Sequence, residues 1–161
     1  MEICCIDAQK LSSYHIGFII GPCLNAGGRL ETAKKAYSLL AAEDYEEALE
    51  KAVELKLLND ERKNMTEEAV ERAKLLAEKK ADKNVLILYV PGVHESIAGI
   101  VAGRVREQFY KPVVILTDSD EVGTAKGSGR SIEGYDMFKE LSKCKSLFTK
   151  FGGHEMAAGM S

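Results

Sequence analysis

Val85-Leu86-Ile87-Leu88-Tyr89-Val90 is a continuous apolar run with the length of one strand, and it decides the fold class. Such runs are typical of strands that are buried on both faces. The following segment, Ile97–Phe109, has the apolar spacing of a helix, and Pro112–Thr117 has the composition of a second strand. Strand, helix and strand in this order predict a βαβ unit with a parallel strand pair. We therefore expect an α/β fold built around a small mixed sheet.

Two glycine-rich segments follow this unit. Thr124–Ser131 is predicted to be an extended strand, Tyr135–Lys143 a short helix, and Gly152-Gly153-His154 a glycine turn. Glycine lets a backbone approach a ligand closely, and amides, hydroxyls and a guanidinium are donors suited to phosphate oxygens. The candidate phosphate contacts are Ser128, Gly129, Arg130, Ser131, Gly152, Gly153 and His154. We expect Arg130 and His154 to lie near one another on a concave, locally positive face.

Upstream, Asp44–Ala81 contains no Gly or Pro and has apolar residues at helical spacing. Asp44 is suited to cap this helix, with Glu47 three residues later. The pattern has one gap, at Asn59–Lys63, where the helix could bend. Before it, Gly21–Arg29 is predicted to be a glycine-rich loop and Thr32–Ala42 a helix. The expected parts are residues 1–43, a connecting helix over 44–82, and an α/β domain over 83–161.

Composition limits the function classes. The 161 residues have a net charge of −3, so a site for a polyanion must be a local patch. The four cysteines, at positions 4, 5, 23 and 144, form no C-x-x-C pair, which argues against zinc and a disulfide framework. We find no signal-peptide pattern and no apolar run of about 20 residues. The expectation is a cytoplasmic protein that does not span a membrane.

Four motifs in register resemble one family. Gly21-Pro22-Cys23-Leu24-Asn25-Ala26-Gly27-Gly28-Arg29-Leu30 is similar to the "GPRINAAGRL" segment of the RecJ-type single-strand-specific DNA exonucleases, which are DHH/DHHA1 phosphoesterases. His94–Arg104 resembles the family's "HEGVIGIVASRL", with Ser96 in place of a usual glycine. Leu58–Arg62 matches its long linker helix, and Gly-Gly-His follows in the expected order. Cys23 stands where the family usually has arginine.

The resemblance implies a division of labour. Residues 83–161 would be a DHHA1-like domain, joined by the long helix to the C-terminal remnant of a DHH catalytic domain. No Asp-His-His triplet occurs in the sequence, so we expect no metal bound here. Mn²⁺ or Mg²⁺ would be held in a domain outside these residues. The implied activity is 5′-to-3′ degradation of single-stranded DNA in repair and recombination, with this part holding the DNA and inactive alone.

The family pattern adds three candidate contacts, and each has a plainer interpretation. Asn25 and Arg29 are expected near the 5′ end of the nucleic acid, or else Asn25 bonds local backbone and Arg29 caps the next helix. His94 contacts substrate or merely starts a helix. Arg130 is expected to bind phosphate, and the plainer alternative is an ion pair with Glu133 at the surface, a contact that contributes little to stability. Asp118-Ser119-Asp120 is interpreted as a solvated turn.

Two other functions stay open from the sequence. One is a smaller DHH/DHHA1 phosphodiesterase acting on short oligoribonucleotides or cyclic dinucleotides, and the other is a nucleic-acid-binding module without chemistry. The partner expected is single-stranded DNA. A second copy of the chain is also expected, because Phe18, Ile19 and Ile20 would lack their native cover.

Overall fold

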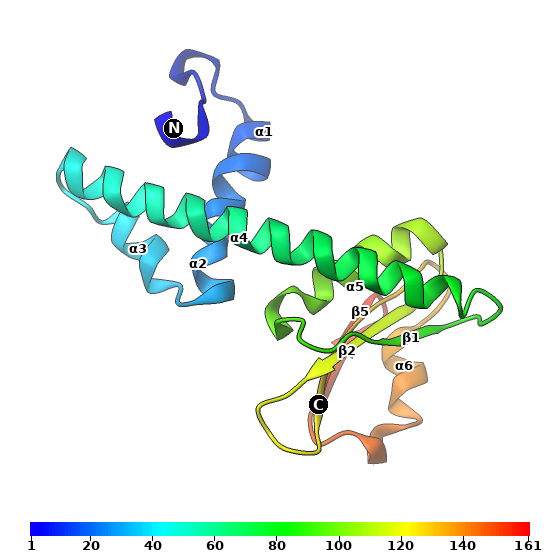
Figure 1. The fold of residues 1–161 in the computed structure, drawn as a ribbon. Helices are drawn as coiled ribbons and strands as arrows, with labels where there is room; N and C mark the ends of the chain where they lie inside the picture. Colours follow the sequence, from blue (N-terminus) through cyan, green and yellow to red (C-terminus); the bar gives the residue numbers. More distant parts are fainter. The chain divides into compact units, whose positions relative to one another are not determined.

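One long helix runs through both compact units of the chain. The computed structural model describes residues 1–161, which divide into a unit Met1–Asn64 and a unit Met65–Ser161. Helix α4 (Tyr45–Glu78) is continuous over 34 residues, including the gap at Asn59–Lys63 (Figure 1). The predicted single helix is therefore confirmed. Its predicted cap is also present, since Asp44 Oδ1 accepts a hydrogen bond from the Glu47 amide at 2.9 Å.

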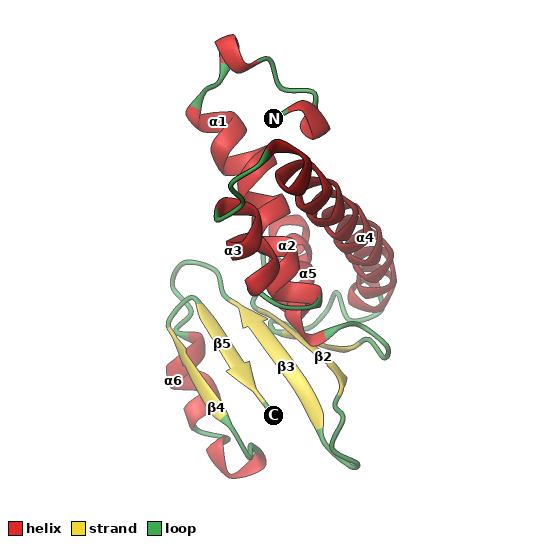
Figure 2. Cartoon of the chain, turned by 90° about the vertical axis from the view of Figure 1, so that its left-hand side faces the viewer, coloured by secondary structure: helices red, strands yellow, loops and turns green.

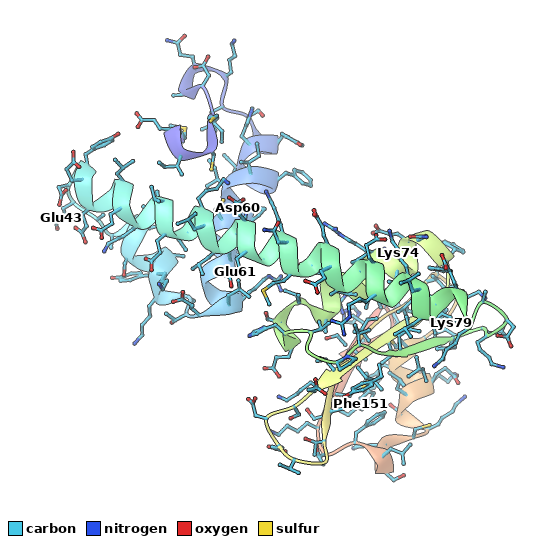
Figure 3. The ribbon with its side chains drawn as sticks, viewed as in Figure 1. Glu43, Asp60, Glu61, Lys74, Lys79 and Phe151 are labelled. Carbon is cyan, nitrogen blue, oxygen red and sulfur yellow. The ribbon has the colours of Figure 1, made fainter.

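Charged side chains cover much of α4. Asp60, Glu61 and Lys74 project from the helix in Figure 3, and Lys79 follows directly after its end. Within the first unit, Lys56 Nζ lies 2.5 Å from Asp60 Oδ2, one turn further along. In the second unit, Lys74 Nζ lies 2.8 Å from Glu71 Oε1. Pairs at these spacings contribute a few tenths of a kcal/mol each.

The first unit is helical. Two 3₁₀ turns (Glu2–Cys4 and Ala8–Lys10) precede a helical stretch made of α1 (Ser13–His15), a π-helical turn (Ile16–Ile20) and α2 (Gly21–Leu30). Helix α3 (Lys34–Leu40) follows, close to the helix predicted over Thr32–Ala42.

The predicted glycine loop at Gly21–Arg29 is wrong, because this segment is α2. Pro22 is the second residue of α2 and follows directly after the π-helical turn. Gly27 is buried, and a Cβ there would lie 3.0 Å from Leu55 Cδ2. The buried glycine allows α2 to pack closely against Leu55, and it does not form a turn.

The second unit is a mixed α/β layer structure. Its strands are β1 (Leu86–Tyr89), β2 (Val113–Asp118), β3 (Ala125–Arg130), β4 (Phe151–His154) and β5 (Ala157–Met160). Its helices besides α4 are α5 (Glu95–Phe109), α6 (Met137–Ser142) and a 3₁₀ turn at Lys145–Leu147. The sheet order is β1-β2-β3-β5-β4. β1 and β2 are parallel with α5 between them, and the other pairs are antiparallel, so the predicted βαβ unit and mixed sheet are confirmed.

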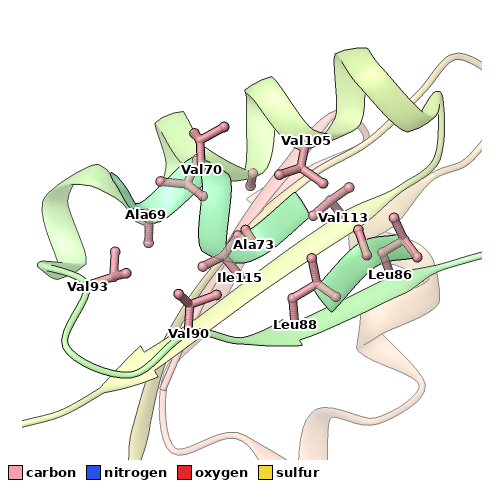
Figure 4. Packing of buried hydrophobic residues seen from close by; sticks show 14 of the residues in the cluster. Ala69, Val70, Ala73, Leu86, Leu88, Val90, Val93, Val105, Val113 and Ile115 are labelled. Carbon is pink, nitrogen blue, oxygen red and sulfur yellow. The ribbon is translucent and has the colours of Figure 1, made fainter. Parts of the chain in front are cut away.

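The two faces of the sheet differ in cover. One face carries Leu86, Leu88, Val113 and Ile115 beneath α5 and the C-terminal half of α4, in one buried cluster (Figure 4). In that cluster Ala69, Val70, Ala73 and Ala77 supply the contact surface of α4. The opposite face carries Val114, Ala158 and Met160, which pack against Met137 of α6. Helix α6 lies along β4 and β5 in Figure 2 and contacts both strands. It covers the face opposite to α5, so it does not cover the α5 side of these two strands.

Candidate functional site

Two rows of residues cross β3, β5 and β4 on the α5 side of the sheet. In the first row, Ser128 is the register partner of Gly159, which is the partner of Gly152. The second row is Arg130, Ala157 and His154. Register partners in antiparallel strands project from the same face of the sheet. On its other side, Ser128 is the register partner of Ile115 in β2, which is buried in the cluster beneath α5. Both rows therefore project from the face of the sheet that α5 covers over β2.

The first row forms the floor of an open pocket of about 500 Å³. A Cβ placed on Gly152 or on Gly159 would meet no atom within 4 Å. No neighbouring atom therefore excludes a larger residue at these two positions. The floor of the pocket is exposed backbone beside the Ser128 hydroxyl. The pocket is lined by Glu95, Ser96, Ala98, Lys126, Gly127, Ser128, Lys150, Phe151, Gly152, Gly159, Met160 and Ser161.

The N-terminal turn of α5 forms one wall. His94 is the N-cap, and its Nδ1 accepts a hydrogen bond from the Ser96 amide at 3.3 Å and lies 2.7 Å from Ser96 Oγ. The first turn of a helix carries a partial positive charge and attracts anions. Glu95, however, is an anion in the same turn, and its Oε2 lies 3.0 Å from Lys126 Nζ. This hydrogen bond raises the pKa of Lys126.

The charged side chains of the pocket are two lysines and one glutamate. Lys126 and Lys150 line it, and Glu95 is the one acidic side chain among the lining residues. Arg130 lies two residues beyond Ser128 on the same face, outside the lining. Its Nη1 donates to the Gly129 carbonyl at 2.8 Å, and the residue is half-buried, with its guanidinium beside Gly99 of α5. This set of hydroxyl, ammonium and guanidinium groups suits phosphate oxygens.

His154 shares a face with Arg130 but lies across an intervening strand. The two are both register partners of Ala157, so their Cα atoms are separated by two strand spacings, roughly 10 Å. The His154 ring is exposed, and its Nδ1 accepts from the Met156 amide at 3.3 Å. The two residues therefore lie on one surface of the sheet, with the width of β5 between them.

Gly152 and Gly153 are not in a turn, contrary to the sequence expectation. They belong to β4, and the chain reverses at Glu155-Met156 between β4 and β5. Glycine was interpreted as a turn former, whereas Gly153 is needed for close strand pairing: a Cβ there would lie 2.3 Å from the Ala157 carbonyl oxygen.

Two more predicted contact residues, Gly129 and Ser131, take part in the packing and hydrogen bonding of the fold itself. Gly129 faces the α6 side, where a Cβ would lie 2.4 Å from Met137 Sδ. Ser131 is fully buried, and its hydroxyl donates to the Tyr135 carbonyl at 2.6 Å. Both residues sit next to Arg130 in sequence, and alternation along the strand directs Gly129 away from the α5 face.

Asn25 and Arg29 lie in the first unit. They are four residues apart in α2, so they share one side of this helix, and both are exposed. The other eight predicted contact residues, from His94 to His154, belong to the second unit. The predicted set therefore falls into two groups, one in each unit.

Sequence reasoning missed Ser96, Lys126, Lys150 and Gly159. One signal was available: in an extended Thr124–Ser131 segment, period-two alternation places Lys126, Ser128 and Arg130 on one face. Nothing in the sequence pattern alone aligns Gly159 with Ser128, because that alignment depends on the pairing of β3 with β5.

The chain contains neither a metal-binding cluster nor a membrane-spanning helix. No group of three or more His, Cys, Asp or Glu side chains is arranged to hold an ion, so these residues do not fit a metal centre. No helix is both long enough and apolar enough to cross a bilayer.

Comparisons with known proteins agree on one group. A family model described as the DHHA1 domain matches residues 82–161. The single-stranded-DNA-specific exonuclease RecJ of Bacillus subtilis (strain 168) is 41% identical over 159 residues, covering 96% of this chain and 20% of the relative. The protein of the same name from Escherichia coli (strain K12) is 39% identical over 170 residues, covering 100% of this chain and 29% of the relative.

Solved structures give the same result. RecJ from Thermus thermophilus in complex with Mg²⁺ matches with a TM-score of 0.82 at 31% identity, covering 91% of this chain and 23% of that one. A structure of the same protein with Mn²⁺ matches with a TM-score of 0.81 at 32% identity, covering 91% of this chain and 22% of that one. The chain thus spans less than a third of the length of these relatives.

Proposed function

Because the chain belongs to the family of the single-stranded-DNA-specific exonuclease RecJ and contains its DHHA1 domain, we propose that it holds the phosphate backbone of single-stranded DNA for an exonuclease. The relatives are named as exonucleases specific for single-stranded DNA. The proposed activity, with its place in DNA repair and recombination, belongs to the protein of which this chain is the DNA-holding part.

The glycine floor is the observation that carries the proposal. Gly152 and Gly159 leave space that any side chain would fill, and they do so in line with Ser128. A chain with sugar and phosphate groups can lie on such a surface within reach of backbone and hydroxyl groups. Lys126 and Lys150 supply positive charge at its border.

The proposed contacts carry no base information. Hydroxyl, ammonium and guanidinium groups bind phosphate oxygens, which are the same at every nucleotide. Binding should therefore be indifferent to sequence and strongly dependent on salt, because it releases counterions. Arg130 and His154, in the second row, would extend the contact along the bound DNA strand. Ser128 and the glycines would hold the sugar-phosphate backbone of that DNA.

We propose that the chemical step is carried out outside these 161 residues. Solved relatives contain Mg²⁺ or Mn²⁺, and a two-metal centre supplies an activated water and charge stabilisation for phosphodiester hydrolysis. In this proposal residues 1–43 are the end of the catalytic domain, 44–82 the connecting helix, and 83–161 the DNA-holding domain. Asn25, Arg29 and His94 remain proposed contacts near the 5′ end.

The experiment is to measure binding of a short oligothymidylate to the 161-residue chain by fluorescence anisotropy. Arg130→Ala should weaken binding about tenfold, because a charge-assisted hydrogen bond to phosphate is lost. It should also reduce the slope of log K against log salt by about 0.7 to 1. No hydrolysis of the oligonucleotide should accompany binding.

Lys139→Ala is the matched control. Lys139 is an exposed cation on α6, which covers the opposite face of the sheet, so its removal changes the net charge equally. This variant should retain wild-type affinity. The proposal is rejected if Arg130→Ala and His154→Ala both bind the oligonucleotide as the wild type does.

A further inference from the structure

Gly99 lies directly under the guanidinium group of Arg130. A Cβ on Gly99 would be 2.6 Å from Nη2, 3.2 Å from Cζ and 3.4 Å from Nη1 of Arg130. All three neighbours belong to the planar end of one side chain. The guanidinium is therefore seated against the backbone of α5, in space that exists because position 99 has no side chain.

Glycine is costly at this place in the chain. Gly99 is the fifth residue of the 15-residue α5, in the helix interior between buried Ala98 and Val101. Glycine in a helix interior lowers the stability of the helix by about 0.5 to 1 kcal/mol relative to alanine. A helix propensity argument thus favours alanine, and the local structure offers one reason against it, the Arg130 guanidinium.

Gly103 provides an internal comparison one turn later. It lies in the same helix, and a Cβ there would meet nothing within 4 Å. The two glycines share residue type, helix and approximate depth, and they differ in the presence of Arg130. An alanine at position 103 is accommodated without any movement of a neighbour.

We propose that Gly99 is the positioning residue of Arg130, so that a side chain at position 99 displaces the guanidinium from its phosphate-binding position. The obstructing atoms are the far end of a flexible side chain, so an alanine at position 99 moves the guanidinium and not the helix. The hydrogen bond from Nη1 to the Gly129 carbonyl, 2.8 Å long, is lost or bent in the process. This inference rests on the proposed function, because it assigns Arg130 a ligand.

The test is a double-mutant cycle in the 161-residue chain, with Gly99→Ala, Arg130→Ala and the combination, and Gly103→Ala as the matched control. Affinity for a short oligothymidylate should fall several-fold for Gly99→Ala and about tenfold for Arg130→Ala. The double variant should bind no more weakly than Arg130→Ala, because Gly99 acts through Arg130. Gly103→Ala should bind like the wild type.

Thermal unfolding of the same variants gives a readout that does not depend on DNA. Gly103→Ala should raise Tm by about 2 to 3 °C through helix propensity. Gly99→Ala should raise Tm less than this when Arg130 is present, and by the full amount when position 130 is alanine. Gly99→Ala should keep its folded circular dichroism spectrum in both backgrounds.

The outcomes separate the two proposals. If Arg130→Ala binds like the wild type, the proposed function of Arg130 fails, whatever the Tm values are. If Arg130→Ala weakens binding but Gly99→Ala does not, the positioning role is overturned and the proposed function stands. The positioning role is also overturned if Gly99→Ala weakens binding further in the Arg130→Ala background, or if its Tm gain is the same with and without Arg130.

Discussion

At the residue scale, the glycines of the second unit serve opposite purposes. Gly127 and Gly129 face the α6 side, where a Cβ would collide with Met160 and Met137 respectively. Gly152 and Gly159 face the other side, where a Cβ would meet nothing. The first pair makes room for methionine side chains of the core, and the second pair leaves a surface open. Composition alone does not distinguish them, but strand alternation does.

Gly129→Ala and Gly159→Ala should therefore separate stability from binding. Gly129→Ala places a Cβ 2.4 Å from the Sδ of Met137, which is buried and has little room to move. Overpacking of this kind costs about 1 to 3 kcal/mol, measured as a lower midpoint in urea. Gly159→Ala should keep the wild-type midpoint and weaken oligothymidylate binding. Equal urea midpoints for the two variants would contradict this assignment of the faces.

At the element scale, Asp118 ties the end of β2 to the loop that follows β1. Its Oδ1 accepts a hydrogen bond from the Tyr89 hydroxyl, and its Oδ2 accepts from the Gly92 amide at 2.7 Å. The Tyr89 hydrogen bond, followed by that of Gly92, lowers the pKa of Asp118. The same contact raises the pKa of Tyr89. Asp118, interpreted from sequence as part of a solvated turn, thus holds the loop that leads to His94 and α5.

Acid should release this tie. A carboxyl group whose pKa is lower in the folded state stabilises the fold above its unfolded-state pKa, about 4, and loses that contribution as pH falls through the lowered folded-state pKa. The difference in urea midpoint between wild type and Asp118→Asn should be constant from neutral pH to about pH 5 and should shrink below about pH 4.

Tyr89→Phe should move the pKa of Asp118 back toward its ordinary value, because the largest cause of the shift is removed. Side-chain carbon chemical shifts followed against pH by NMR measure this directly. Tyr110→Phe, which changes an exposed tyrosine at the other end of α5, is the control and should leave the Asp118 titration as it is. An unchanged Asp118 pKa in Tyr89→Phe would refute the assigned cause.

The elements themselves were predictable to different degrees. Periodicity identified α4, α5 and the β1 and β2 strands, because each has a long or strongly apolar pattern. Glycine misled the prediction at α2 and at β4. In both places a glycine is required by a close approach of other chain segments, to Leu55 at Gly27 and to Ala157 at Gly153, and such approaches depend on tertiary packing. For the same reason, Ser96, Lys150 and Gly159 of the pocket could not be found from sequence.

At the scale of the whole molecule, the net charge of −3 does not describe the binding surface. The acidic residues are concentrated in the middle of the sequence: Glu31–Lys83 contains fourteen Asp and Glu against eleven Lys and Arg. Lys126, Lys150 and Arg130 all lie in the second unit. Binding that depends on such a local patch falls steeply with salt while the protein as a whole stays acidic.

Self-association through the first unit is the remaining expectation at this scale. Phe18 is 72% exposed, and its ring stacks on that of Tyr14, with centroids 5.1 Å apart and Tyr14 itself 60% exposed. Ile16 is also exposed, whereas Ile19 and Ile20 are half-buried. Adjacent exposed apolar side chains on one helical stretch favour burial against another surface. The chain should therefore form dimers or larger species as its concentration rises.

Light scattering over a concentration series measures this association. Phe18→Lys should shift the mass toward that of a monomer, because it removes apolar area and adds repulsion between like charges. Leu75→Lys is the matched control: Leu75 is 61% exposed on α4 and is in the second unit, so the same charge change there should not alter the mass. Association driven by apolar burial is strengthened by sulfate, whereas association driven by charge is weakened by salt. A monomeric mass for the wild type at the highest concentration would show that Tyr14 and Phe18 remain solvated.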